Sequence, residues 1–205
     1  MTGAASSLAA LLAPAARAFE VSLTAPLVSA LDNYAALLLA WNLRINLSGA
    51  RTLEALATEH LADAFALYPH LPAAGQCVDV GSGAGLPGLV LALLRPDLEF
   101  QLLEPTQKRR AFLAAAIRNA RLTNVAISSD RLDGHVLARG TAYDFAVARA
   151  VFPIETWLAE GQTLVKVGCV VAGLTGGNPS CVPLGAIAYS YDVGAGPRAV
   201  LIVRK

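Results

Sequence analysis

Apolar residues in the first third of the chain recur at the spacing of an amphipathic helix. Five of them are separated by four, three, four and three positions: Leu27, Leu31, Tyr34, Leu38 and Trp41. This spacing places them on one face of a helix. A turn near residues 42–49 and a second helix over about 53–68 follow, the helix capped by Thr52 and ended by Pro69. The alanine-rich start lacks the basic residues of a secretory signal, so we expect another helix there.

From Gln76 onward short apolar runs alternate with helical patterns. Strands are expected at 77–80, 99–104, 124–129, 143–149 and 166–174, and helices at 86–95, 107–121 and 155–165. This alternation is typical of right-handed βαβ units, which build a mostly parallel sheet. Two alternating runs around a Gly-Ala-Gly-Pro turn in residues 186–205 predict an antiparallel hairpin at one edge.

The expected fold class is therefore α/β, with a doubly wound, mostly parallel, Rossmann-like sheet. Residues 1–72 are predicted to form a helical extension packed on the core, and residues 73–205 one compact Rossmann-like domain. The length of 205 residues suits one domain with an extension. Hydrophobic residues make up 55% and charged residues 15% of the chain, which is enough apolar surface for a sheet covered on both faces.

Cysteine usage and hydropathy indicate the cell compartment in which the protein is expected. No run reaches the roughly 18 uninterrupted apolar residues of a membrane helix, so we expect no membrane association. Cys77, Cys169 and Cys181 are far apart and form no Cys-x-x-Cys motif. We interpret them as free thiols of a cytoplasmic protein, without a metal site.

The charge is near neutral overall but uneven along the chain. The net charge is +1, whereas residues 108–149 contain eight basic and three acidic residues. This local surplus could form a basic face that binds nucleic acid, and it could equally be a solvated helix with scattered arginines.

A glycine-rich loop between the first strand and the next helix is the main candidate for chemistry. Gly81, Gly83 and Gly85 form Gly-x-Gly-x-Gly, and the same loop read through Gly88 matches the dinucleotide motif Gly-x-Gly-x-x-Gly. Glycines there allow the backbone to approach a nucleotide-like ligand closely. Asp79, still in the strand, could hold the loop or a ligand amine.

Two cofactors fit this loop, a nicotinamide dinucleotide and S-adenosyl-L-methionine. Only about a hundred residues follow Glu104, which is short for the second nucleotide-binding half of a dehydrogenase. S-adenosylmethionine needs one such half and has an ammonium group that an acid could bind. Glu104 stands 21 residues after Gly83 at the end of a strand, where a carboxylate can accept the ribose hydroxyls. Asp133 follows the next strand, where adenine would lie, although a plain loop acid is equally consistent with its position.

The stretch from Trp41 to Leu174 resembles the glucose-inhibited division protein B family of bacteria. The resemblance rests on an Asn-Leu-Ser turn, a His60-x-x-Asp63 helix, the glycine loop with its Leu-Pro-Gly extension, Lys108-Arg109 and an Arg149-Ala150 pair. The family implies an S-adenosylmethionine-dependent methyltransferase of the class I fold that modifies guanine N7 of 16S ribosomal RNA, alone or in the small ribosomal subunit. It releases S-adenosyl-L-homocysteine. A monomer is expected.

The resemblance also implies roles for individual residues. It places cofactor contacts at Gly81, Leu86, Leu132, Asp133 and Arg149, in addition to the loop and the two strand acids discussed above. Guanine N7 has a free lone pair, so the enzyme needs to position its substrates rather than to deprotonate them. No catalytic residue is therefore firm, and His60, Asp63 and Arg149 are candidates for positioning. The candidate RNA contacts are Arg44, Arg51, Lys108, Arg109 and Arg110.

Departures from the family pattern keep other functions open. Thr175 stands where a lysine is usual, Glu104 where an aspartate is usual, and the segment after Thr175 is abbreviated. A divergent methyltransferase that acts on another RNA or a small molecule is the main alternative. A nicotinamide-dependent oxidoreductase and a cofactor-binding regulator without activity are the others.

Overall fold

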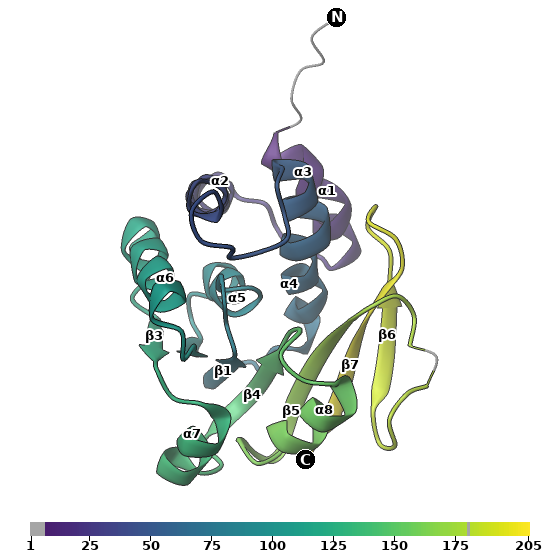
Figure 1. The fold of residues 1–205 in the computed structure, drawn as a ribbon. Coiled ribbons are helices and arrows are strands. Elements are labelled where there is room, and N and C mark those ends of the chain that lie inside the picture. The colour runs from purple at the N-terminus through teal and green to yellow at the C-terminus, as the bar shows by residue number, and fades with distance from the viewer. Residues whose placement is uncertain (1–6, 180) are drawn as a thin grey trace, which may run out of the picture.

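A computed structural model describes residues 7–179 and 181–205. Its centre is a seven-stranded sheet (Figure 1). The strands are β1 (Gln76–Val80), β2 (Glu99–Leu103), β3 (Val125–Ser128), β4 (Tyr143–Ala148), β5 (Val165–Gly176), β6 (Ile187–Tyr191) and β7 (Arg198–Arg204). In this described part, no helix is long and apolar enough to cross a bilayer.

The strand order is β3-β2-β1-β4-β5-β7-β6. The first five of these strands pair in parallel, and β7 lies antiparallel between β5 and β6. This arrangement confirms the predicted doubly wound α/β sheet with a C-terminal antiparallel hairpin. The chain leaves β1 towards β2 and later returns to β4 on the other side, so the order reverses between β1 and β4. Ligands of open α/β sheets bind at such a switch point.

Helices cover both faces of the sheet. They are α1 (Leu8–Ala18), α2 (Ala25–Asn42), α3 (Leu53–Leu56), α4 (Ala62–Leu67), α5 (Gly88–Leu94), α6 (Gln107–Ala120), α7 (Leu132–Arg139) and α8 (Ile154–Gly161). The first six lie on one face and share the larger apolar core, whereas α7 and α8 lie on the other (Figure 1). Alternate residues of β7 enter the two cores, with Val200 and Ile202 in the first and Leu201 and Val203 in the second.

The structure differs from the sequence-based prediction in several places. The helix expected over 155–165 ends at Gly161, and Val165 already belongs to β5. Helix α7 was expected as a loop, and Asp133 therefore lies in the first turn of a helix. Helix α5 begins at Gly88, two residues later than expected, and the Leu86–Pro87 peptide bond before it is cis. The helix expected over about 53–68 is interrupted by a π-helical turn at Ala57–Leu61, and a 3₁₀ turn at Tyr68–His70 carries the helical path past Pro69.

The N-terminal helices pack directly on the sheet-covering helices. Helix α2 contacts α5 and α6, and α1 contacts α4. Phe112 of α6 lies between two aromatic rings of α2, with ring centroids 6.3 Å from Tyr34 and 5.6 Å from Trp41. We propose, as the sequence predicted, that residues 1–72 are an extension packed on the domain in residues 73–205. These contacts support the packing of residues 7–72, and residues 1–6 lie outside the described part of the chain.

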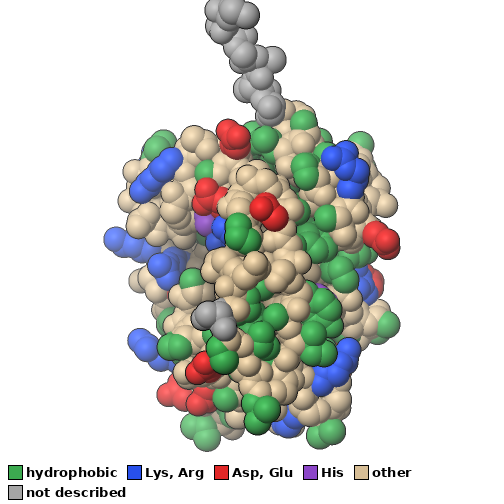
Figure 2. Space-filling view, turned by 90° about the vertical axis from the view of Figure 1, so that its right-hand side faces the viewer, with side chains coloured by type: hydrophobic (Ala, Val, Ile, Leu, Met, Phe, Trp, Pro, Cys, Tyr) green, Lys and Arg blue, Asp and Glu red, His purple; other side chains and the backbone are tan. Residues whose placement is uncertain are grey.

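The face that carries the C-terminal hairpin has few charges in its middle, and its Lys and Arg side chains lie towards the edges (Figure 2). The exposed large apolar side chains in residues 181–191 are Val182, Leu184, Ile187 and Tyr189. A basic surface is thus not formed on this face.

Candidate functional site

The glycine loop follows β1 at the edge where the parallel strands end. Gly81, Gly83 and Gly85 all have positive φ angles, of 71°, 55° and 82°, which side chains other than glycine rarely adopt. The amides of Gly81 and Ser82 both donate to the carbonyl of Leu103 at the end of β2, at 2.8 and 3.0 Å. The loop is therefore folded back over the carboxyl end of the neighbouring strand.

A cavity of about 300 Å³ opens beside this loop. Its walls come from five separate parts of the chain. The lining residues are Leu47, Ser48, Gly49, His60, Gly81, Ser82, Gly83, Ala84, Leu86, Arg109, Arg149, Ala150 and Val151. An added Cβ at Gly83 would meet only the carbonyl of Gly81, at 3.8 Å. The backbone at Gly83 consequently faces open space that a ligand can approach.

Glu104 is buried directly under the loop. One carboxylate oxygen accepts from the Gly83 amide at 2.9 Å and the other from the Thr106 amide at 2.8 Å. Arg109 lies 3.8 Å from the same carboxylate. Glu104 thus fixes the loop and keeps free lone pairs, because each carboxylate oxygen can accept two hydrogen bonds. Its contact with a ribose stays a prediction.

Asp79 lies beneath the loop and does not line the cavity. One oxygen accepts from the Gly88 amide at 3.0 Å, at the first residue of α5, where a carboxylate is favourable. The other oxygen has no partner among the described residues. Burial raises the pKa of Asp79 to about 7. The geometry assigns Asp79 to the start of α5, and its contact with a ligand amine stays a prediction.

Asp63 is the centre of an ion-pair cluster that joins three parts of the chain. Its carboxylate accepts two bonds from Arg198 of β7 at 3.0 Å and one from the hydroxyl of Tyr191 of β6 at 2.6 Å. The Arg149 Nε lies 3.3 Å from it. Asp63 therefore ties the C-terminal hairpin to the residue that follows β4.

His60 contacts the same arginine. Its Nδ1 pairs with an Arg149 Nη2, so Nδ1 is an acceptor, because a guanidinium can only donate. Burial, and then the charges of Arg149 and Arg198, lower the pKa of His60 to about 4. The imidazole is neutral at physiological pH and carries its proton on Nε2. That atom is buried and has no hydrogen-bond partner among the described residues.

Tyr34 is a functional candidate that the sequence did not reveal. Its buried hydroxyl donates to the carbonyl of Ala84 in the glycine loop at 2.6 Å. Burial raises its pKa, so the hydroxyl stays protonated. In the sequence Tyr34 is one of five residues on an apolar helix face, and nothing in that pattern distinguishes it from the core residues beside it.

Other residues predicted for the site lie outside the cavity. Leu132 packs against the core under α8, and Asp133 is exposed at the start of α7. Neither lines the cavity beside the glycine loop, so their contact with adenine stays a prediction. The structure groups Gly81, Gly83, Leu86, His60 and Arg149 around the cavity instead. Gly85 packs against Leu89 and Leu113 of the core, so its contact with the cofactor stays a prediction.

The basic residues predicted to bind RNA have different surroundings. Arg44, Arg51 and Lys108 are exposed. Arg109 lines the cavity beside Glu104. Arg110 donates to the carbonyl of Glu104 at 3.0 Å and is half-buried. Arg44, Arg51, Lys108 and Arg109 are thus exposed, whereas Arg110 is half-buried.

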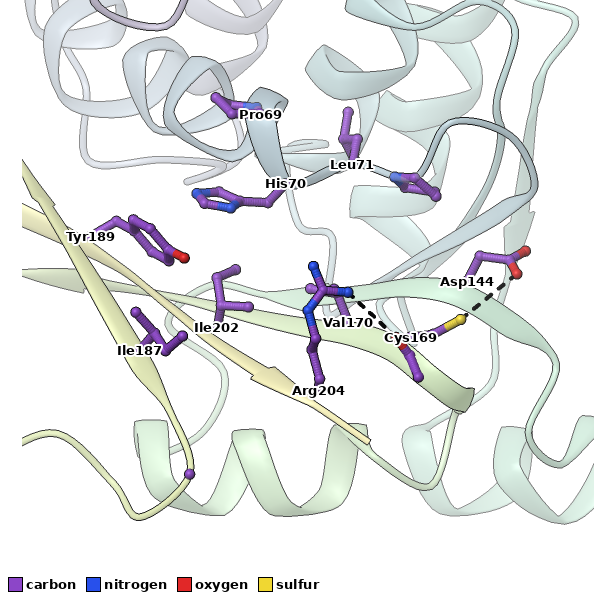
Figure 3. Close-up of a pocket in the computed structure, with 13 residues that line it drawn as sticks. Pro69, His70, Leu71, Asp144, Cys169, Val170, Ile187, Tyr189, Ile202 and Arg204 are labelled. Atoms are coloured by element: carbon purple, nitrogen blue, oxygen red, sulfur yellow. Dashed lines mark hydrogen bonds between the residues drawn. The ribbon is translucent and has the colours of Figure 1, made fainter.

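A second cavity, of about 380 Å³, lies between the 3₁₀ turn and the C-terminal hairpin (Figure 3). The ring of His70 faces that of Tyr189, with centroids 4.5 Å apart, and Arg204 reaches the carbonyl of Gly168 at 3.4 Å. None of the predicted site residues lines this cavity. Within the described residues, no three His, Cys, Asp or Glu side chains lie close enough together to hold a metal ion.

The sheet order and the glycine loop at its switch point define the class I methyltransferase fold. Solved structures agree on the fold. A putative rRNA methylase from Clostridium thermocellum superposes with a TM-score of 0.51 at 13% identity, over 69% of this chain and 93% of the other. A precorrin-6y C5,15-methyltransferase from Geobacter metallireducens gives a TM-score of 0.50 at 13% identity, over 70% and 86% of the two chains.

Sequence comparison identifies the family. The model of the GidB family, described as rRNA small subunit methyltransferase G, matches residues 27–180. A ribosomal RNA small subunit methyltransferase G of Xanthomonas axonopodis pv. citri is 32% identical over 200 residues, which cover 93% of this chain and 91% of the relative. One from Wolinella succinogenes is 37% identical over 151 residues, or 73% and 75% of the two chains. The chain belongs to the GidB family.

Proposed function

We propose that this protein transfers a methyl group from S-adenosyl-L-methionine to guanine N7 of 16S ribosomal RNA in the small ribosomal subunit. The observation that carries the proposal is the cavity at the switch point, bounded by the glycine loop and Arg149, in a chain of the GidB family. The expected form is a monomer in the cytoplasm. The protein's residues contribute position and shielding from water, because N7 has a lone pair and needs no base.

The residues around the cavity suit the parts of S-adenosylmethionine. The Gly83 backbone leaves room for close approach, Glu104 can accept from ribose hydroxyls, and Arg149 can pair with a carboxylate. The cofactor supplies an electrophilic methyl group on a sulfonium. Arg149 directly follows β4, and His60 lines the same cavity beside it. Both residues therefore border the space that the guanine enters.

Calorimetry with S-adenosylhomocysteine and two glycine variants tests cofactor binding. Gly83→Ala places a methyl group in the open space beside the loop and should weaken binding at least tenfold, which corresponds to about 1.4 kcal/mol. Gly196→Ala is the matched control. Gly196 has a φ of 87° and open space around it, but it lies in the β6–β7 turn. Both variants add left-handed strain of about 1–2 kcal/mol, so only the cofactor affinity should separate them.

The substrate is tested in cells. Loss of N7-methylguanosine from the 16S ribosomal RNA of a deletion strain, restored by the wild-type protein and not by Gly83→Ala, is the expected result. An unchanged content would contradict the proposal and favour the divergent methyltransferase. Heat on titration with NADH, and none with S-adenosylhomocysteine, would favour an oxidoreductase instead.

A further inference from the structure

We propose that His60 selects guanine by donating a hydrogen bond from Nε2 to the O6 atom of the target base. The inference rests on the proposed function, because it concerns the base whose N7 receives the methyl group. It assigns a specificity role to a side chain that has no need to act as an acid or a base.

The first step is the direction in which the imidazole can donate. Arg149 always donates, so the Nδ1 of His60 that faces it must accept. Asp63 holds the Arg149 Nε at 3.3 Å and so fixes the guanidinium beside the ring. The ring proton is thereby placed on Nε2. A neighbouring bond sets the tautomer of a histidine in this way in many sites.

The second step is that this donor has no partner among the described residues. The Nε2 of His60 is buried and has no partner among residues 7–179 and 181–205. A buried N–H without a partner costs about 1–3 kcal/mol. An acceptor that pairs with this N–H on binding removes that cost and so binds more tightly. The ring lines the cavity beside the glycine loop, together with Arg149 and Ala150.

The third step is the chemistry of the base. In guanine the atom next to N7 on the same edge is the O6 acceptor, whereas adenine carries the N6 amino donor at that place. A donor at O6 leaves the N7 lone pair free to point at the methyl group. The same donor would face another donor in adenine and leave both unpaired. A neutral Nε2–H therefore distinguishes guanine from adenine without touching N7.

The experiment combines a change in the protein with a change in the base. His60→Phe keeps a planar ring and removes both nitrogens. Replacing the target guanine by 2-aminopurine, which lacks O6, removes the acceptor. Small subunits are reassembled with ligated 16S ribosomal RNA that carries either base at the mapped methylation site. Methyl transfer is measured as kcat/KM. The affinity of the S-adenosylhomocysteine complex for each RNA is measured separately, by fluorescence for the 2-aminopurine RNA and by competition for the guanine RNA.

We expect each single change to lower kcat/KM and affinity about tenfold, as for one hydrogen bond worth about 1.4 kcal/mol. The two changes together should cost little more than either alone, because both remove the same bond. The effect of 2-aminopurine on the nucleophilicity of N7 appears equally with both proteins and cancels from this comparison. Losses that multiply to about a hundredfold would overturn the inference.

Two further variants serve as controls, one that retains a hydrogen-bond donor at position 60 and one that removes a histidine elsewhere. His60→Gln retains an N–H donor and should preserve part of the preference for guanine over 2-aminopurine. His70→Phe removes a half-buried histidine ring at the other cavity (Figure 3) and should leave both measurements unchanged. Calorimetry with S-adenosylhomocysteine identifies any variant that fails to fold. If the wild-type protein methylates no guanine N7 in the particle, the proposed function fails; if it does but the losses multiply, only the role of His60 fails.

Discussion

Two cavities of this protein each place a histidine beside an arginine, and only one of them lies at the switch point of the sheet. His60 pairs with Arg149 beside the glycine loop, and His70 lies near Arg204 at the other cavity. Burial lowers the pKa of both histidines, and the nearby arginine lowers it further. The difference is in what holds the arginine. Arg149 is fixed by the buried Asp63, whereas the Arg204 side chain makes one long bond, to a carbonyl, within residues 7–179 and 181–205.

The comparison teaches that a shifted histidine pKa does not by itself identify a site. Both rings are partly buried beside a cation, so both shift in the same direction. A site needs, in addition, a fixed partner and a space for a ligand at the strand ends. The cluster around Asp63 supplies the fixed partner at only one of the two cavities.

The largest expected effect is on stability, from Asp63→Asn. The change leaves the Arg149 and Arg198 guanidiniums, whose side chains are 18% and 17% exposed, without their counter-charge. We expect a loss of about 3–5 kcal/mol in the free energy of unfolding, measured with urea. Asp144→Asn, at the other cavity, breaks a pair with the half-exposed Lys166 and should cost less than about 1 kcal/mol. Equal losses would show that the Asp63 cluster is no stronger than a surface pair.

The next largest expected effect is a difference between His60 and His70 in how each contributes to the pH dependence of stability. Above their usual pKa both rings are neutral in the folded and the unfolded chain. As the pH falls from about 6.5, the unfolded chain takes up protons that the folded chain refuses, so stability declines until the pH reaches the folded pKa, about 4 for His60. His60→Phe should flatten this decline more than His70→Phe does.

Urea unfolding of the wild type and both variants between pH 4 and 7 measures that difference. Comparing variants cancels the carboxylates that titrate in the same range. A steeper decline in His60→Phe than in the wild type would contradict the assigned direction of the His60 pKa.

The smallest expected effect concerns two buried tyrosines. Tyr34→Phe removes the bond to the Ala84 carbonyl, and Tyr143→Phe removes a bond of 2.7 Å to His135. Each should cost about 1 kcal/mol of stability. Only Tyr34→Phe should weaken the binding of S-adenosylhomocysteine, by about fivefold, because its partner belongs to the glycine loop. Calorimetry on both variants measures this, and equal affinities would leave Tyr34 a structural residue alone.

Much of the site could be predicted because its parts are local. The glycines, Glu104 and Leu86 are read from one loop and the strand that follows. The contacts around Asp63 could not be predicted, since they join residues 128 and 135 positions apart. One signal was available: Arg198 shares the face of Val200 and Ile202 in an alternating strand, so a charged side chain points at a buried layer. That pattern demands a partner without saying which one.

Helix α7 was missed for a different reason. It has eight residues, with Gly134 near its start and only His135 fully buried, so the apolar period is too weak to distinguish it from a loop. No pattern in the sequence predicts the π-helical turn at residues Ala57–Leu61 either. Its extra residue per turn changes where His60 points relative to Asp63, and no spacing rule for an α-helix anticipates that.

The sequence by itself determined the alternation of strands and helices apart from α7, the antiparallel hairpin and the glycine loop. Each of these follows from periodicity or from backbone freedom within a few neighbouring residues. Only the tertiary structure decided that Asp63 holds Arg149, that Arg149 fixes the tautomer of His60, and that Tyr34 reaches the loop from α2. Those contacts depend on how separate elements pack across the sheet, and a linear pattern carries no distance between residues that are far apart in the chain.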